Sequence, residues 1–215
     1  MTLRVESSSF ADGALMPGSY AFAVPKGDSV APEGGNRSPH LRWSGAPEET
    51  RSYAVVIYDD AVPVDASNAG VPGTVIERDA ERRDFAHLLL VDLPPTVTEL
   101  PDGALSDEVR FGGKPPGPSP VGGTTGVNDF TGFFAGHEQL GGTYGGYDGP
   151  FPPPNDERVH TYHLCVHALD VDSLALHDGF GLEDVRRAMD GHVLASGEWT
   201  GVYSLHPDVR RELES

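Results

Sequence analysis

The sequence predicts a mainly β protein, built as a sandwich of two antiparallel sheets with one or two short helices near the C-terminal end. Three observations lead to this fold class: short apolar runs bounded by turn residues, a high content of glycine and proline, and helical periodicity confined to the last third of the chain. The chain has 215 residues, with 27 Gly and 19 Pro, and no shift in composition marks a boundary. We therefore expect a single domain over residues 1–215.

Six segments have the composition of β-strands, and each is bounded by Gly, Pro, Asn or Asp. They are residues 20–24, 40–43, 52–59, 85–93, 159–170 and 198–205. Two of them, 52–59 and 85–93, are continuously apolar rather than alternating, which predicts strands in the middle of the sandwich that are covered on both faces. The segment from about 105 to 148 is rich in Gly and Pro without clear periodicity, so we expect a long irregular connection there.

The helical signal lies after residue 180. Leu182, Val185 and Met189 recur at helical spacing, acidic residues occupy the first turn, and Gly191 offers a C-terminal cap. This pattern predicts one short amphipathic helix. A second helix is expected from Pro207, because proline suits the first helical position.

The charge balance excludes one class of partner. The chain has 33 Asp and Glu against 15 Lys and Arg, a formal net charge of −18, and only two of the basic residues are lysines. A surface of this sign repels phosphate backbones and anionic lipid, so nucleic-acid binding is not expected. At about 1 M salt the Debye length is only about 3 Å and the self-repulsion is nearly erased, so we expect the high-salt cytoplasm of a halophile, such as a halophilic archaeon.

Cysteine usage and hydropathy limit the remaining classes. Cys165 is the only cysteine, which rules out an intramolecular disulfide and a cysteine-based zinc site; its apolar neighbours predict a small buried side chain. The first ten residues lack the basic start and apolar core of a signal peptide, and no later run is long enough for a transmembrane segment. We therefore expect a cytoplasmic protein.

Polar residues at the ends of the predicted strands are the candidates for chemistry. Asp59 and Asp60 close one apolar strand, His87 opens the next, and His160 and Tyr162 open a third. An aspartate beside a histidine fixes its tautomer and favours the imidazolium, so two histidines and a tyrosine hydroxyl would form a cluster of donors for a small anion. The alternative is a set of separate histidines, each satisfied near a sheet edge.

Other chemistries find little support in the sequence. It has no phosphate-binding loop of the G-x-x-x-x-G-K-[ST] type, no G-x-S-x-G nucleophile elbow and no H-E-x-x-H zinc motif. His160, His163 and His167 are close in sequence, but in a strand His160 faces one side while His163 and His167 face the other. We therefore expect neither a metal site nor a cofactor.

An ordered set of motifs resembles the phosphatidylethanolamine-binding protein family, and within it the bacterial and archaeal branch called Raf-kinase-inhibitor-like. The motifs are "SPHLRWSGAPEETRSYAVVIYDDAVP" (38–63), "HLLLVDLP" (87–94), "GVNDFTG" (126–132), "GPFPPPNDERVHTYHLCVHALD" (149–170) and "GHVLASGEWTGVYS" (191–204). The resemblance implies a β-sandwich with a Greek-key element and a small pocket at one end for phosphate, acetate or a phosphoethanolamine-type head group.

The family pocket maps onto six positions here. They are Asp59, His87, Gly149, Pro150, His160 and Tyr162. The chain departs from the family where the D-P-D-A-P box reads "DDAVP", so that Asp60 is a second candidate for the binding aspartate, and where Thr161 replaces the arginine of H-R-Y. Two insertions, around 64–84 and 132–146, lie beside the pocket in the linear map and are expected to cover or narrow it.

The leading hypothesis for function is a non-catalytic binding protein for a small anion or phosphorylated head group. The resemblance adds regulation of a partner kinase or protease as a further role. One alternative is a small hydrolase or lyase that uses a His–Asp pair as general base, although no nucleophile is evident. Another is an inhibitor of a protein partner that acts through surface loops while the pocket stays empty.

Overall fold

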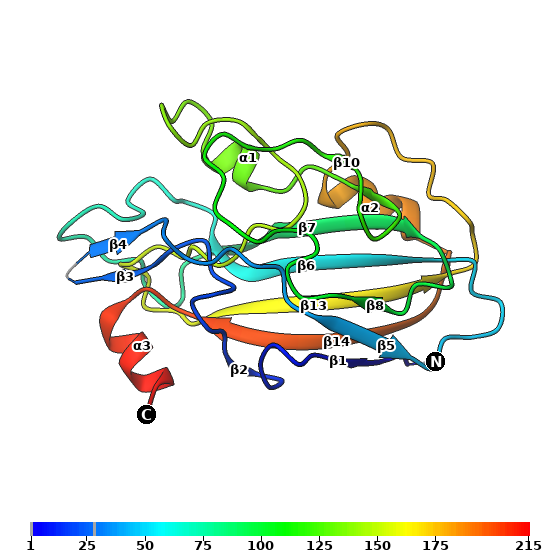
Figure 1. The fold of residues 1–215 in the computed structure, drawn as a ribbon. Helices are drawn as coiled ribbons and strands as arrows, with labels where there is room; N and C mark the ends of the chain where they lie inside the picture. Colours follow the sequence, from blue (N-terminus) through cyan, green and yellow to red (C-terminus); the bar gives the residue numbers. More distant parts are fainter. Residues whose placement is uncertain (1, 28) are drawn as a thin grey trace.

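The computed structural model describes residues 2–27 and 29–215, and its centre is a seven-stranded sheet (Figure 1). The strand order is β10-β11-β7-β6-β13-β14-β2. The long strands are β6 (Ser52–Pro63), β7 (Arg82–Leu93), β13 (His160–Leu169) and β14 (Val193–Tyr203). The short ones are β2 (Ala14–Leu15), β10 (Gly117–Pro118) and β11 (Thr124–Thr125).

A smaller sheet packs on one face of the large one and completes the predicted sandwich. It contains β1 (Arg4–Glu6), β5 (Leu41–Ser44) and β8 (Glu99–Leu100), and Trp43 and Leu41 of β5 belong to the core between the sheets. The pairing within both sheets is antiparallel except where β2 runs parallel to β14. Two further pairs lie outside them: β3 (Val24–Lys26) with β4 (Ser29–Ala31), and β9 (Gly113–Lys114) with β12 (Thr143–Tyr144).

The opposite face of the large sheet is covered by a helix rather than by a second sheet. In α2 (Leu182–Met189) the predicted apolar positions Leu182, Val185 and Met189 are buried against outward-facing residues of β6 and β7. The second predicted helix is α3 (Pro207–Leu213), and a single turn, α1 (Phe130–Phe133), lies within the long connection. Among the described residues, no helix has the length and apolar character needed to cross a membrane.

The prediction of a strand over 20–24 was wrong for residues 20–23, and only Val24 lies in a strand, at the start of β3. Residues 20–23 are largely buried but form no ladder, because their backbone bonds to a turn instead: the N–H groups of Phe22 and Ala23 both donate to the carbonyl of Pro150, at 3.0 and 3.2 Å. The long connection over 105–148 is less irregular than expected, since it contains β9 to β12 and α1. Residues 20–23 and the α1 part of the connection lie at the end of the sheet where β6 ends and β13 begins (Figure 1), whereas β11 pairs with Leu90 and Val91 toward the other end of β7.

Because both faces of β6 are covered, neighbouring valines on opposite faces should contribute equally to stability. Val55 lies in the core between the sheets and Val56 in the core under α2. We expect Val55→Ala and Val56→Ala each to lower the free energy of unfolding by about 2 kcal/mol, measured by urea denaturation. Thr161→Ala, at a partly exposed position of β13, is the control and should change it little. A loss of stability in Val55→Ala but not in Val56→Ala would contradict the conclusion that both faces of β6 are covered.

Candidate ligand-binding site

A small cavity lies at the end of the sheet where β6 ends and where β7 and β13 begin. Its volume is about 40 Å³, room for roughly three water molecules or one small ion. The wall is mostly aromatic, aliphatic and proline side chains. The fourteen lining residues are Asp59, Val62, Pro63, Ala66, Ala69, Arg83, Phe85, His87, Phe130, Phe133, Phe151, Pro152, Pro153 and Tyr162.

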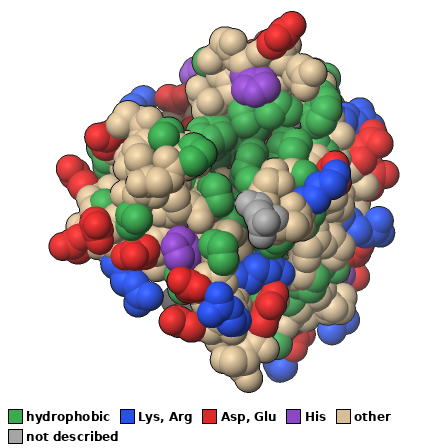
Figure 2. All heavy atoms as spheres, turned by 90° about the vertical axis from the view of Figure 1, so that its left-hand side faces the viewer, with side chains coloured by type: hydrophobic (Ala, Val, Ile, Leu, Met, Phe, Trp, Pro, Cys, Tyr) green, Lys and Arg blue, Asp and Glu red, His purple; other side chains and the backbone are tan. Residues whose placement is uncertain are grey.

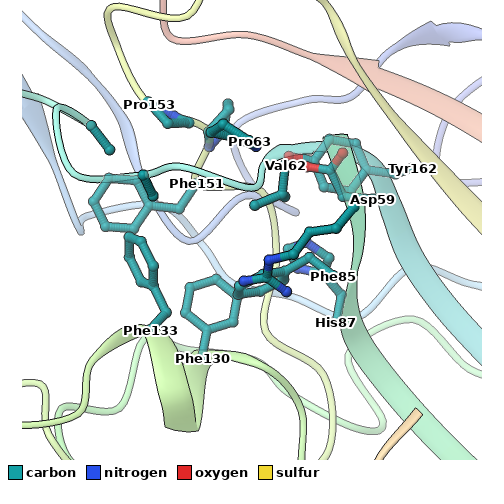
Figure 3. A pocket seen from close by; sticks show the side chains of 14 residues that line it. Asp59, Val62, Pro63, Phe85, His87, Phe130, Phe133, Phe151, Pro153 and Tyr162 are labelled. Atoms are coloured by element: carbon teal, nitrogen blue, oxygen red, sulfur yellow. The ribbon is translucent and has the colours of Figure 1, made fainter. Parts of the chain in front are cut away.

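Three polar side chains from three adjacent strands form one side of this cavity. Asp59 comes from β6, His87 from β7 and Tyr162 from β13, and all three are almost fully buried. Figure 3 shows them together, facing Phe130, Phe133 and Phe151 on the opposite side. We call the set of Asp59, His87 and Tyr162 the polar base.

A β-bulge in β7 brings His87 into the polar base. Ile57 pairs with Leu88 but the next residue, Tyr58, pairs with Ala86, so His87 is an extra residue without a partner in β6. An extra residue of this kind bends the strand and changes which side chains face inward. Phe85 and His87 therefore both line the cavity, while Leu88 and Leu90 continue into the core between the sheets.

His87 is fixed in one tautomer by a backbone group. Its Nδ1 lies 2.6 Å from the carbonyl oxygen of Asp148, and since a carbonyl can only accept, Nδ1 carries the proton. Burial lowers the pKa of His87, so the ring is neutral near pH 7. Its other nitrogen, Nε2, is then an acceptor, and no described residue forms a hydrogen bond with it.

Asp148 is itself held by buried polar groups, and this fixes the carbonyl that orients His87. Its carboxylate accepts hydrogen bonds from Asn36 (2.8 Å), Lys114 (2.6 Å) and Asn128 (2.9 Å). Its backbone N–H donates to the carbonyl of His87 at 3.0 Å. His87 is thus positioned by both a side-chain cluster and a local backbone pair.

His160 is in the opposite protonation state. Its Nδ1 lies 2.6 Å from Asp59 Oδ2 and its Nε2 lies 3.2 Å from Asp156 Oδ2, so both nitrogens face carboxylates and both carry protons. Burial opposes the charge, but the Asp59 carboxylate and the two hydrogen bonds raise the pKa of His160 to about 9. The imidazolium in turn holds the pKa of Asp59 below its ordinary value despite burial.

The series of charges ends in a buried ion pair. Asp156 accepts from Arg82 Nη1 at 2.5 Å, and the side chain of Arg82 is only 6% exposed. We call the four alternating charges of Asp59, His160, Asp156 and Arg82 the charge network; its formal charges sum to zero. Asp59 Oδ1 also accepts a hydrogen bond from the backbone N–H of Ala61 at 2.8 Å, which fixes the orientation of the carboxylate beside the cavity.

Tyr162 completes the polar base with a group that has no partner. Its hydroxyl is buried, and none of the described residues forms a hydrogen bond with it, although the Asp59 carboxylate is near enough to affect it. Burial and the charge of Asp59 raise the pKa of Tyr162 well above its ordinary value, so the phenol keeps its proton. A buried hydroxyl without a partner normally costs stability, which indicates a position prepared for a ligand.

Of the seven residues that the sequence predicted for the pocket, the structure places three in the cavity wall and four elsewhere. Asp59, His87 and Tyr162 line the cavity, whereas His160 lies behind Asp59. Gly149 and Pro150 are not among the lining residues, and the turn contributes Phe151, Pro152 and Pro153 instead. Gly149 packs so closely against the carbonyl of Tyr20 that a Cβ would lie 1.9 Å from its oxygen, which explains the glycine there.

Asp60 faces away from the cavity. Its carboxylate lies 3.2 Å from His163 Nε2 on the outer face of the sheet, where Glu198 contacts the other ring nitrogen. The predicted alternation of His160 against His163 and His167 is confirmed by the burial pattern of β13. Cys165 shares this outer face and is only partly buried, so the prediction of a small buried side chain was wrong in degree.

Sequence reasoning missed the aromatic half of the wall and Arg83. Phe130 and Phe133 come from α1, and Ala66, Ala69 and Arg83 come from the segment expected as an insertion. Phe133 lines the cavity and is 45% exposed (Figure 3). Figure 2 shows that hydrophobic side chains gather on the face of the molecule that lies on the left in Figure 1. Phe130 lies in the GVNDFTG motif, but that motif was given no role in the pocket, and Phe133 lies beyond it.

The charge network predicts how stability depends on pH. Because folding raises the pKa of His160 from 6.5 to about 9, its contribution is complete below pH 6.5 and is lost as the pH rises through 9. We expect the free energy of unfolding to fall by on the order of 3 kcal/mol between pH 6.5 and 9.5, measured by urea denaturation. His163→Gln, which removes a half-buried histidine of the same strand, should keep most of this fall. A flat profile in the unmodified protein would contradict a protonated His160.

Comparison with known proteins shows which family and which proteins the chain resembles. The family model described as phosphatidylethanolamine-binding protein matches residues 6–204. The UPF0098 protein YbcL of Escherichia coli is 28% identical over 203 residues, covering 94% of this chain and 87% of that protein. YbhB from the same organism is 27% identical over 202 residues, covering 94% of this chain and 100% of that protein.

Solved structures agree with the sequence comparison. The crystal structure of E. coli YbcL, described as a member of the mammalian PEBP family, superposes with a TM-score of 0.65 at 26% identity, covering 95% of this chain and 99% of that chain. A PEBP homologue from Chlamydia trachomatis has the same fold, with a TM-score of 0.62 at 24% identity and coverage of 94% and 97%. The resemblance found in the motifs is confirmed: this chain belongs to the phosphatidylethanolamine-binding protein family.

Proposed function

We propose that this chain is a non-catalytic binding protein whose cavity holds the phosphate-bearing head group of a small molecule. The observation that carries the proposal is the polar base: a buried hydroxyl without a partner, a carboxylate and a neutral imidazole nitrogen around a space of about 40 Å³. Apolar walls around a few convergent polar groups are typical of small-molecule sites. The family is named after phosphatidylethanolamine, and a space of this size takes one charged group of its head group rather than the whole of it.

The polar base restricts the form in which a phosphate can bind. Asp59 and His87 Nε2 are acceptors, and only the Tyr162 hydroxyl can donate. A fully ionised phosphate would therefore face two acceptors, so the ligand must bring hydrogen-bond donors. A monoprotonated phosphate or a head group with an ammonium meets this requirement.

The hydrolase or lyase alternative receives less support from the geometry. The His–Asp pair of that alternative would be His160 with Asp59, but both nitrogens of His160 are donors to carboxylates and its ring lies outside the cavity wall. His87 Nε2 faces the cavity unprotonated, but its Nδ1 donates to a backbone carbonyl, so no carboxylate supports His87 as a base. The cavity wall formed by the described residues also contains no Ser, Thr, Cys or Lys that could act as a nucleophile. Binding without catalysis is the function that these residues favour.

A pair of tyrosine variants tests the proposal. Tyr162→Phe removes the hydroxyl without a partner, so it should leave stability unchanged or raise it by about 1 kcal/mol, and weaken binding of phosphoethanolamine about tenfold. Tyr203→Phe in the neighbouring strand is the control: its hydroxyl donates to the carbonyl of Ala23 at 3.0 Å, away from the cavity, so this variant should lose stability and keep its affinity.

Urea denaturation and isothermal titration calorimetry measure the two effects. The proposal requires opposite effects in the two variants: Tyr162→Phe loses affinity and keeps its stability, whereas Tyr203→Phe loses stability and keeps its affinity. It is wrong if phosphoethanolamine, inorganic phosphate and acetate all fail to bind the unmodified protein at millimolar concentration. It is also wrong if Tyr162→Phe binds them as the unmodified protein does.

A further inference from the structure

A loop of residues 65–75 connects the end of β6 to the segment that leads into β7, and both of its ends are fixed. The N–H of Val64, just before the loop, donates to the carbonyl of Glu81 at 2.9 Å. The N–H of Ile76, just after the loop, donates to the carbonyl of Asn155 at 2.9 Å. We call residues 65–75 the cavity loop; it is the cyan segment beyond the end of β6 in Figure 1.

Between these fixed ends, one side chain holds the cavity loop to the rest of the protein by hydrogen bonds. Asn155 Oδ1 accepts a hydrogen bond from the N–H of Gly70 at 2.8 Å. Its Nδ2 donates to the carbonyl of Asn68 at 2.9 Å and to Thr74 Oγ1 at 3.0 Å. In the part of the chain that the structure describes, no other residue outside the loop forms a hydrogen bond with it, and its remaining hydrogen bonds are internal. The attachment of the loop therefore depends on Asn155.

Asn155 is itself held in place at the end of a turn. It follows a run of three prolines, whose rings restrict the backbone. The next residue, Asp156, pairs through its backbone with Ile76, and its carboxylate contacts His160 and Arg82 in the charge network. A rigid support of this kind lets a single side chain fix a loop at a low cost in entropy.

The cavity loop separates the cavity from a larger groove. In the loop, Ala66 and Ala69 line the cavity, whereas residues 70–74 line the groove. The turn divides in the same way, with residues 152–153 at the cavity and residues 154–155 at the groove. The groove has a volume of about 660 Å³, and its other walls come from the β3–β4 pair and from α3 and the residues before it. Of the described segments, only the loop and this turn line both spaces, so a displacement of the loop would join them.

We infer that Asn155 limits the size of the group that the cavity admits, because its side chain holds the cavity loop in place as a wall. This inference rests on the proposed function and adds the residue that selects ligands by size. While the Asn155 bonds are formed, the space of about 40 Å³ takes one small charged group. When they open, the loop moves between its two fixed ends and the cavity becomes continuous with the groove, whose lining includes Val30, Val71 and Leu205. A ligand with a larger apolar substituent then fits.

Limited proteolysis with thermolysin, which cuts before exposed apolar residues such as Val71, measures how firmly the loop is held without any ligand. Asn155→Ala removes the side-chain bonds to the loop. Asn68→Ala is the matched control, because it removes a bond within the loop, to the carbonyl of Val75 at 3.2 Å, and keeps the backbone carbonyl that Asn155 contacts. We expect cleavage within residues 65–75, located by mass spectrometry, to be about tenfold faster in Asn155→Ala and nearly unchanged in Asn68→Ala.

Calorimetry with two phosphates of different size tests the selection itself. Inorganic phosphate and phenyl phosphate carry the same kind of anionic group, and at pH 5.5 both bring a proton to the polar base, since the second pKa of a phosphate monoester is about 6. We expect Asn155→Ala to bind phenyl phosphate about tenfold more tightly than the unmodified protein does, and inorganic phosphate with unchanged affinity. Asn68→Ala should change neither affinity.

The outcomes distinguish this inference from the function on which it rests. If Asn155→Ala is cleaved no faster than Asn68→Ala, Asn155 does not hold the loop and the inference is wrong. If cleavage is faster but the affinity for phenyl phosphate relative to inorganic phosphate does not change, the loop does not limit ligand size; the inference is then wrong while the head-group pocket stands. If neither phosphate binds the unmodified protein or the variants, the proposed phosphate site fails and selection by size fails with it, whatever the proteolysis shows.

Discussion

The hydrogen bond between His160 and Asp59 is the interaction on which the rest of the site depends. It is buried, and taking two charges out of water is costly unless each is paired and further hydrogen-bonded. The charge network meets that condition, since Asp156 and Arg82 extend the alternation and the N–H of Ala61 satisfies the second oxygen of Asp59. The network also joins the end of β6 to the starts of β7 and β13, so the three strands that carry the polar base are held together by its charges.

This arrangement gives two neighbouring histidines opposite roles. His160 is charged and lies behind the wall, where it keeps Asp59 ionised and immobile. His87 is neutral because its Nδ1 meets a backbone carbonyl instead of a carboxylate, and its ring packs among Phe85, Phe130 and Tyr162. The cavity therefore presents acceptors at its base, whereas the strand-end pattern of the sequence had indicated a cluster of donors.

Most of the fold could be predicted from the sequence, and about half of the site. The continuous apolar runs of β6 and β7 and the helical spacing of α2 are local patterns that tertiary structure did not override. Residues 20–23 were mistaken for a strand because the hydrogen-bond partner of their backbone is a turn far away in the sequence, at Pro150. The direction in which a side chain points depends on details that the sequence pattern does not encode. Here these details are the bulge at His87, the close contact at Gly149, and the position of His160 behind Asp59. That Arg83 and the Phe130–Phe133 turn form part of the wall follows only from packing.

The protonation states of the two histidines at the site test this account most directly. Nitrogen-15 NMR of the imidazole rings at pH 7, in the unliganded protein, distinguishes imidazolium from each neutral tautomer. The account predicts His160 with protons on both nitrogens and His87 neutral with its proton on Nδ1. A charged His87 together with a neutral His160 would contradict it, because the base of the cavity would then present donors and Asp59 would lose the charge that holds it in place.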